Sequence, residues 1–413
     1  MNISVLTLAL VFILIAIRQV GNIRLQIWQV MALGAGTVLV TGQIIPLDAF
    51  HAINFDVMFF LFGMFIIGQA LEESGYLAHA AYKYFKHANS VDSLMLLIIF
   101  GFGGASAVLM NDTIAIIGTP IVLLIARKHE MSPKLILLAL AFSVTIGSVV
   151  SPIGNPQNLL IALNGKIADP FGTFFRWLFI PTVINLFVVY IVLKRFYRSD
   201  FHGVPLKYSQ EPIRNQELAF LSKLSIQMVA VLIVLKMLSV ALRLNIEFRL
   251  TYIALASALP ILIGSKQRWI IIRKIDWHTL IFFASMFILM DSVWRSEFFQ
   301  YILAESKQDI TSTGMILSVS IVLSQLISNV PLVALYQPML IHVGTVTKGF
   351  MALAVGSTIA GNLFILGAAS NIIIIQNAEK KSHNTITFWD FAKVGIPLTI
   401  LNIAVYWLFL SVL

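Results

Sequence analysis

The sequence contains no cysteine and few charged residues, and each shortage excludes certain kinds of site or fold. Without cysteine the chain forms neither disulfides nor thiolate metal sites. Only 11% of the 413 residues are charged and 59% are hydrophobic, whereas about a quarter of the residues in soluble domains are charged. The longest polar stretch, Lys194 to Lys223, has the length of a loop and leaves no room for a soluble domain. The chain is therefore predicted to be an all-α polytopic membrane protein.

Motifs that would indicate an enzyme are also missing. The sequence has no His, Asp and Glu cluster at metal-ligand spacing, no phosphate-binding loop and no nucleophile elbow. We therefore expect no enzyme, no catalytic residue, and no cofactor or metal apart from Na⁺ as a coupling ion. A net charge of +9 occurs in nucleic-acid-binding proteins, but basic cytoplasmic loops explain it in a membrane protein. No nucleic-acid partner is predicted.

One uncharged stretch is too long and too irregular for a simple membrane-spanning helix. It runs from Leu135 to Gly165 and would be about 46 Å long if helical, against a hydrocarbon core of roughly 30 Å. Pro152 and Pro156 lack amide donors and Gly154 adds flexibility, so the helix is predicted to break there. Transporters use such breaks, buried in protein or lining a wet cavity, to form sites at the membrane midplane. A discontinuous helix is therefore predicted over residues 135–165.

Two other segments are predicted to enter the membrane and return on the same side. Residues 93–110 and 112–126 are separated only by the step Asn111-Asp112, which leaves no loop between two crossings. A re-entrant hairpin over 93–126 therefore fits better. A second hairpin is predicted over 310–347, where an uncharged run is interrupted at Ser328-Asn-Val-Pro331.

The remaining apolar runs bring the prediction to about ten spans. Two of the ten are the discontinuous helices 135–165 and 349–378, the second with Gly367-Ala-Ala-Ser-Asn371 near its centre. The other spans are predicted near residues 3–17, 27–46, 57–72, 175–193, 219–242, 250–265, 278–292 and 395–412.

The order of these segments recurs and predicts two structural repeats. Each half has three spans, a hairpin, a discontinuous helix and a closing span. The matching positions are Asn111 with Asn329, Pro120 with Pro338, Gly154 with Gly367, and Asn158 with Asn371. With five crossings in each unit, the second copy is inverted relative to the first. The predicted boundaries are 1–198 for the first inverted repeat, 199–218 for a cytoplasmic linker and 219–413 for the second inverted repeat.

The basic residues predict the orientation of the chain. With the N-terminus outside and both hairpins re-entrant, 20 lysines and arginines fall in inside loops and 7 in outside loops. This bias follows the positive-inside rule. The N-terminus and the C-terminus are therefore predicted to lie outside a multi-pass protein of the plasma membrane.

Helix starts at the hairpin tips are candidate anion sites. The first amides of a helix are free and its dipole is positive there, so opposed helix starts can bind an anion without arginine. Carbonyls freed where a helix unwinds suit Na⁺ or a proton carrier. The predicted substrate-binding residues are Asn111, Thr113, Asn158, Ser328, Asn329, Ser370 and Asn371. The predicted ion-coupling residues are Asp112, Ser151, Gly154, Asn155 and Gly367.

A simpler explanation is that these polar residues only cap helices. Recurrence at matching spacing in both halves favours ligand binding in addition to capping. Asp112 is the acid placed most clearly inside the membrane, where carboxylates are costly and usually functional. For Asp112, a coupling role and a capping role both remain open.

The motifs resemble those of the ion transporter superfamily. This group includes arsenite-efflux permeases, citrate and dicarboxylate carriers, and Na⁺/H⁺ antiporters related to the melanosomal P protein. Asn-Asp-Thr at 111–113 and Ser-Asn-Val-Pro at 328–331 fall where dicarboxylate carriers have paired Ser-Asn-Thr tips. Ser-Pro-Ile-Gly-Asn-Pro-Gln-Asn at 151–158 is similar to the Gly-Asp/Asn-Pro-x-Asn signature of the arsenite and P-protein branch. The resemblance implies inverted repeats, each with a re-entrant hairpin and a discontinuous helix.

The predicted function is that of a secondary active transporter. Its cargo would be a small anion, either an organic carboxylate or an inorganic oxyanion, coupled to Na⁺ or H⁺. A Na⁺/H⁺-type cation antiporter and an arsenite efflux permease are the alternatives. A membrane scaffold without a transport cycle would not need polar breaks at mid-depth. The predicted partners are the small anionic substrate and the lipid bilayer, and a homodimer is left open.

Overall fold

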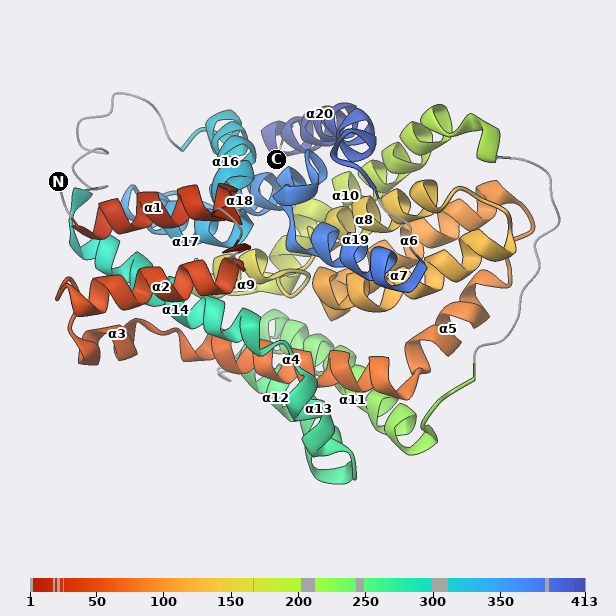
Figure 1. Ribbon diagram of the computed structural model, residues 1–413, viewed down its shortest axis with the longest axis horizontal. Coiled ribbons are helices and arrows are strands. Elements are labelled where there is room, and N and C mark those ends of the chain that lie inside the picture. Colours follow the sequence, from red (N-terminus) through yellow and green to blue (C-terminus); the bar gives the residue numbers. More distant parts are fainter. Residues whose placement is uncertain are drawn as a thin grey trace.

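The computed structural model describes residues 3–17, 19–20, 23–24, 26–165, 167–201, 212–242, 249–298, 311–382 and 386–412. Nearly all of this described part is helical, which confirms the all-α prediction. Its two short strands, β1 (Gln19–Val20) and β2 (Ile23–Arg24), form one antiparallel pair. Figure 1 shows many of the helices lying side by side along the long axis of the molecule.

The first half follows the predicted order of segments, with one early helix end. The predicted span 27–46 stops at Val40, because Gly42 adopts a φ of +70° in the turn before Pro46. The helices are α1 (Ile3–Ile17), α2 (Ile27–Val40), α3 (Pro46–Ala52), α4 (Phe55–Ser74), α5 (Tyr76–Phe85), α6 (Val91–Leu109), α7 (Asn111–Lys128), α8 (Pro133–Ser148), α9 (Pro156–Asn164), α10 (Pro170–Phe196) and the 3₁₀ turn η1 (Arg198–Asp200).

The second half follows the predicted order of segments from Thr313 onward, and the inverted repeat stays a prediction. Both predicted interruptions, near Ser328 and near Gly367, are helix boundaries in the structure. The helices are α11 (Gln216–Ala241), α12 (Leu250–Gly264), α13 (Arg268–Lys274), α14 (Trp277–Arg295), α16 (Thr313–Ile327), α17 (Asn329–His342), α18 (Thr347–Ile359), the 3₁₀ turns η2 (Ala360–Asn362) and η3 (Ile365–Gly367), α19 (Ala369–Ser382) and α20 (Phe388–Val412).

Several of these helices match the dimensions of a bilayer. Within the described ranges, six are long and apolar enough to cross a membrane: α4, α6, α10, α11, α14 and α20. Shorter apolar helices, including α8 and α12, add to them. The chain is therefore a multi-pass membrane protein, and the count of ten spans stays a prediction.

The helices pack in two groups. In the first, α4 packs against α11 and α12, and α14 packs against α2. Gly63 permits the contact between α4 and α12, because a Cβ there would lie 2.8 Å from the Ala254 carbonyl. In the second group, α8 packs against α6 and α7, α16 against α18, α7 against α19, and α10 against α20. Gly147 of α8 touches the backbone of Gly103 in α6, where a Cβ would lie 2.1 Å from the carbonyl oxygen.

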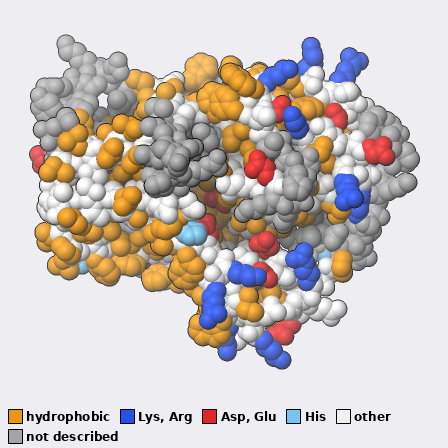
Figure 2. Space-filling view, in the orientation of Figure 1, with side chains coloured by type: hydrophobic (Ala, Val, Ile, Leu, Met, Phe, Trp, Pro, Cys, Tyr) orange, Lys and Arg blue, Asp and Glu red, His pale blue; other side chains and the backbone are white. Residues whose placement is uncertain are grey.

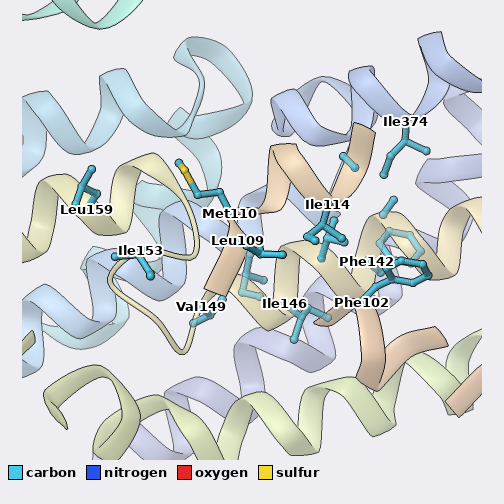
Figure 3. Close-up of a cluster of buried hydrophobic side chains, with 14 of the residues drawn as sticks. Phe102, Leu109, Met110, Ile114, Phe142, Ile146, Val149, Ile153, Leu159 and Ile374 are labelled. Carbon is cyan, nitrogen blue, oxygen red and sulfur yellow. The ribbon is translucent and has the colours of Figure 1, made fainter. Parts of the chain in front are cut away.

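The hydrophobic core surrounds the first hairpin tip. Every residue of α8 from Leu135 to Ser148 is buried, as expected for a helix with protein on all sides. Figure 3 shows the cluster where α6, α7, α8 and α9 meet. Its labelled members are Phe102, Leu109, Met110, Ile114, Phe142, Ile146, Val149, Ile153, Leu159 and Ile374. Apolar packing of this kind holds the irregular backbone in one conformation.

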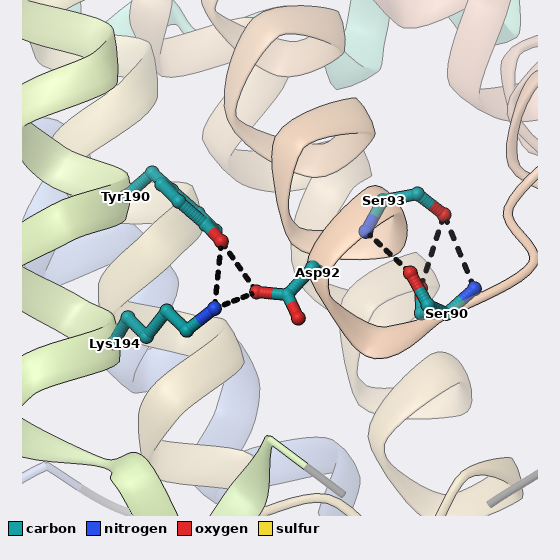
Figure 4. Close-up of polar contacts among 5 residues, drawn as sticks. All are labelled: Ser90, Asp92, Ser93, Tyr190 and Lys194. Atoms are coloured by element: carbon teal, nitrogen blue, oxygen red, sulfur yellow. Dashed lines mark hydrogen bonds and ion pairs between the residues drawn. The ribbon is translucent and has the colours of Figure 1, made fainter. Parts of the chain in front are cut away.

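A polar cluster joins the start of α6 to the end of α10 (Figure 4). Lys194 Nζ lies 2.6 Å from Asp92 Oδ1 and 3.1 Å from the Tyr190 hydroxyl, which also donates to Asp92. Ser90 caps α6 by accepting a hydrogen bond from the Ser93 amide at 3.1 Å. The partners are half-exposed, so this cluster fixes the helix ends more than it stabilises the fold.

Candidate transport site

Each predicted hairpin turns at one residue with an unusual backbone conformation. Met110 separates α6 from α7 with φ 67° and ψ 142°, and Ser328 separates α16 from α17 with φ 70° and ψ 162°. Residues with a Cβ rarely adopt positive φ, and such strain clusters where a ligand site imposes it. The shared conformation at matching positions supports the pairing of the two tips that spacing predicted.

The first tip is tied to the first helix break. The Asn111 amide donates to the Gly154 carbonyl at 2.8 Å, and the Asn111 side-chain oxygen accepts from the Asp112 amide at 2.9 Å. Behind the tip, α4 approaches so closely that a Cβ on Gly68 would lie 2.8 Å from the Thr113 methyl group. Thr113 therefore packs against α4, and the tip is held from two sides.

In the first break, between α8 and α9, side chains satisfy the freed backbone groups. Asn158 Nδ2 donates to the carbonyls of Ser148, Val149 and Ser151 at 3.2, 3.3 and 3.0 Å. Asn155 caps α9 by accepting from the Asn158 amide at 2.9 Å. The carbonyls of Ser151 and Gly154, which we predicted to serve a coupling ion, both accept hydrogen bonds from the protein.

A threonine from the other half completes this first break. Thr358 of α18 places its hydroxyl 3.2 Å from Asn155 Nδ2, 3.3 Å from Gln157 Nε2 and 3.4 Å from Asn158 Oδ1. Thr358 was not among the residues predicted from the sequence. A signal existed, since Thr358 precedes Asn371 by the same thirteen positions that separate Thr145 from Asn158.

The second break, between α18 and α19, contains the same kind of hydrogen bond from an asparagine side chain to a backbone carbonyl. Asn371 Nδ2 donates to the Gly361 carbonyl at 2.7 Å, ten positions back along the chain, as Asn158 does to Ser148. Thr145 lies against this break, because a Cβ on Gly361 would be 3.4 Å from its methyl group. Each discontinuous helix therefore packs a threonine against the break of the other.

The second break differs from the first in its unpaired oxygens. Among the described residues, the side-chain oxygens of Thr145, Asn329, Ser370 and Asn371 are buried without a hydrogen-bond partner. Gln325 Oε1 is also unpaired, and it lies 2.9 Å from where a Cβ on Gly367 would be. Buried polar atoms are nearly always paired in proteins, so oxygens left unpaired are candidates for contact with an ion or a solute. Oxygen atoms of this kind are ligands for Na⁺.

Six helix starts line one cavity, and four of them belong to the predicted hairpin tips and helix breaks. The cavity has a volume of about 550 Å³, and its wall includes Asp112 of α7, Pro156 of α9, Ser328 before α17 and Ala369 of α19. The lining residues that the structure describes include no lysine or arginine. The positive ends of the helix dipoles therefore contribute positive potential to this wall. Figure 2 shows a hollow near the middle of this face with acidic side chains in it.

The predicted site residues divide into a wall and a layer behind it. Asp112 and Ser328 line the cavity directly. The layer behind consists of buried side chains that are at most 8% exposed: Asn111, Thr113, Ser151, Asn155, Asn158, Asn329, Ser370 and Asn371. Asp276 and His278 at the cavity rim were missed by our sequence analysis, because in the sequence they look like the ordinary polar flank of a span.

A smaller cavity of about 220 Å³ lies further along α9, α14 and α17. It is lined by the ends of α9, α14 and α17 that are remote from the first cavity, with Asn164, Asp291 and Gln337 as polar residues. At its edge Arg295 bonds to both Asp291 and Asp48 at 2.6 Å. The two cavities lie along opposite halves of α14.

Comparison with known proteins gives matches over most of the chain. A family model described as a citrate transporter matches residues 10–350. An uncharacterized transporter of Mycobacterium tuberculosis is 28% identical over 395 residues, with 90% of each chain covered. The silicon efflux transporter LSI3 of Oryza sativa subsp. japonica is 27% identical over 445 residues, again with 90% of each chain covered.

The fold also resembles a solved transporter. The crystal structure of the YdaH transporter of Alcanivorax borkumensis matches with a TM-score of 0.60 at 13% identity, covering 99% of this chain and 97% of that one. This likeness concerns the fold. The family match extends over well more than half of the sequence, and it agrees with the superfamily that the motifs indicated. The chain belongs to the citrate transporter family and is a membrane transporter.

Proposed function

We propose that the protein is a secondary transporter that moves a small oxyanion or carboxylate in exchange for, or together with, cations. The observation that carries this proposal is the cavity that six helix starts line, among them the start of α7 with Asp112. Helix N-termini present free amides and positive dipoles to an anion. An anion bound there would contact backbone amides and the Ser328 hydroxyl, with the buried asparagines holding these groups in place.

Cation coupling would divide between the two halves. Asp112 is a carboxylate in the cavity wall, and such acids in membrane proteins carry protons or pair with ions. Its amide contacts Asn111, and α7 begins without a side-chain cap hydrogen bond, which supports a coupling role for Asp112 over a capping role. The unpaired oxygens near Asn329 and Asn371 fit Na⁺ in the second half. We propose H⁺ at Asp112 and Na⁺ at the second break.

The test is solute uptake by proteoliposomes that contain the purified protein. Radiolabelled citrate, succinate, phosphate and silicic acid would each be supplied under an imposed pH gradient, an imposed Na⁺ gradient, or neither. We expect accumulation of at least one anion that depends on a cation gradient, with protein-free liposomes as the control. Flux of none of the four solutes, or flux that no cation gradient drives, would contradict the proposal.

A second candidate cargo is an uncharged oxyacid such as silicic acid. The described cavity wall contains two carboxylates, Asp112 and Asp276, and no lysine or arginine, which favours a neutral solute over a highly charged one. The similarity to a silicon efflux transporter points in the same direction. Uptake of silicic acid without uptake of citrate, succinate or phosphate in the same assay would select this candidate.

The proposed orientation has both termini outside the plasma membrane. Single cysteines can test it in this cysteine-free chain, for example Glu130→Cys after α7 and Ala168→Cys before α10, both of which replace exposed residues. The first should react with an impermeant maleimide only from the cytoplasm, and the second only from outside. Reaction of both cysteines from the same side would contradict the orientation.

A further inference from the structure

His278 lies at the rim of the cavity that contains Asp112. It belongs to the first turn of α14, its side chain is exposed, and it lines the cavity together with Asp112 and Asp276. An imidazole ring can both accept and donate a proton, which suits it to pass protons between other groups. An exposed imidazole at the mouth of a cavity is placed to take protons from the surrounding solution.

The surroundings hold the His278 ring in one orientation. The ring stacks on the Trp28 indole, with centroids 4.9 Å apart and planes inclined by 22°. The indole Nε1 donates in turn to Gln26 Oε1 at 2.5 Å, so the Trp28 side chain is held as well. Trp28 and Gln26 also line the cavity. The stack therefore keeps the imidazole edge at the mouth.

The nearby carboxylate of Asp276 already accepts two hydrogen bonds from Thr279. Its Oδ1 accepts from the Thr279 amide at 3.0 Å and its Oδ2 from the Thr279 hydroxyl at 2.5 Å, so Asp276 caps α14. The charged and titratable groups of the described lining are then Asp112 from α7 and Asp276 and His278 from the start of α14. The described lining residues of α2, α9, α17 and α19 contribute none.

We propose that His278 is the proton-transfer residue between the solution at this mouth and Asp112. In the inward step the imidazolium releases a proton, which passes through water in the cavity to a carboxylate oxygen of Asp112. The neutral imidazole then takes a proton from the solution, and the reverse sequence discharges Asp112. No other group changes its charge. This inference rests on the proposed coupling at Asp112 and adds the route by which protons arrive.

The experiment follows protonation of Asp112 directly and needs no substrate. After a rapid pH drop, the infrared carbonyl band of the protonated carboxyl group would be recorded with time in reconstituted protein, and assigned by its loss in Asp112→Asn. We expect His278→Gln to slow the rise of this band about a hundredfold, at the lower end of the usual contribution of a positioned acid or base. Imidazole added at this mouth should restore the rate.

A matched control exists at another histidine. His342, at the end of α17, also lies beside a tryptophan, with ring centroids 6.4 Å from Trp294, but it is not among the described lining of either cavity. His342→Gln should leave the band kinetics unchanged. An unchanged rate in His278→Gln, with the Asp112 band present, would overturn the role of His278 alone. Absence of the Asp112 band from the wild-type protein would overturn proton coupling at Asp112 and this route with it.

Discussion

The two helix breaks share an asparagine-to-carbonyl hydrogen bond and differ in how their other polar atoms are paired. In both, an asparagine donates to a carbonyl ten positions back, Asn158 in the first break and Asn371 in the second. In the first break, amides surround the hydroxyl of Thr358. In the second, the hydroxyl of Thr145 and the side-chain oxygen of Asn371 have no partner in the described part of the chain. The two breaks thus have similar backbone contacts, but the polar atoms are paired in the first and partly unpaired in the second.

Two matched positions explain the difference. Asn155 and Gln157 of the first break correspond to Ala368 and Ser370 of the second, so the amides that contact Thr358 have no counterpart beside Thr145. Each buried polar atom without a partner costs about 1–3 kcal/mol. A fold tolerates several such atoms together where a ligand pairs with them. We therefore interpret the first break as a structural contact between the two halves of the chain, and the second break as a cation site.

The largest expected effect concerns Asp112, which has no acidic counterpart because Val330 occupies the matching position. Asp112→Asn should reduce proton-driven accumulation to the level of protein-free liposomes, because the amide cannot carry a proton. Counterflow exchange of the same solute at equal pH should persist, which shows that the variant is folded and binds its cargo. Proton-driven accumulation equal to that of the wild type would remove Asp112 from the coupling mechanism.

The next effect separates the two asparagines by stability. Asn158→Ala removes donors to three carbonyls and should destabilise the protein by about 2–3 kcal/mol, whereas Asn371→Ala removes one such bond and should cost about 1 kcal/mol. Melting temperatures in detergent without Na⁺ provide the comparison. A larger loss of melting temperature for Asn371→Ala than for Asn158→Ala would reverse our assignment of the structural contact and the cation site.

The smallest effect concerns the matched threonines. Thr358→Val leaves the amides of Asn155 and Gln157 without their shared acceptor and should lower stability by about 1 kcal/mol. Thr145→Val removes a hydroxyl that has no protein partner and should be close to neutral in the absence of Na⁺. Raising the Na⁺ concentration should stabilise Thr358→Val as it stabilises the wild type, and Thr145→Val less. Equal Na⁺ responses in both variants would exclude Thr145 from the cation site.

The sequence predicted the places where helices break better than the contacts across the breaks. Pro152, Gly154 and Pro156 prohibit a continuous helix, and the structure interrupts it between Ser148 and Pro156. The polar step at Asn111 likewise falls within one residue of the turn at Met110. These are local effects of backbone chemistry, and one stretch of sequence is enough to state them.

Contacts between the halves were beyond the same reasoning. Thr358 lies about two hundred positions from the amides that it contacts, and a threonine in an apolar helix looks like any other. The rim of the cavity brings Trp28 of α2 against His278 of α14, two residues that no local pattern connects. The early end of α2 at Val40 has a local cause in the positive φ of Gly42, but an isolated glycine in an apolar run does not by itself predict a helix end.

The most direct test of the account is Na⁺ binding by a protein whose second break has been given the amides of the first. The double substitution Ala368→Asn and Ser370→Gln supplies amides beside Thr145, as Asn155 and Gln157 do beside Thr358. Equilibrium binding of ²²Na⁺ to purified protein would be measured for the wild type, this double variant and Thr358→Val. We predict saturable binding to the wild type and to Thr358→Val, and loss of binding in the double variant. Undiminished binding to the double variant, or no saturable binding to the wild type, would contradict the division of the two breaks into a structural contact and a cation site.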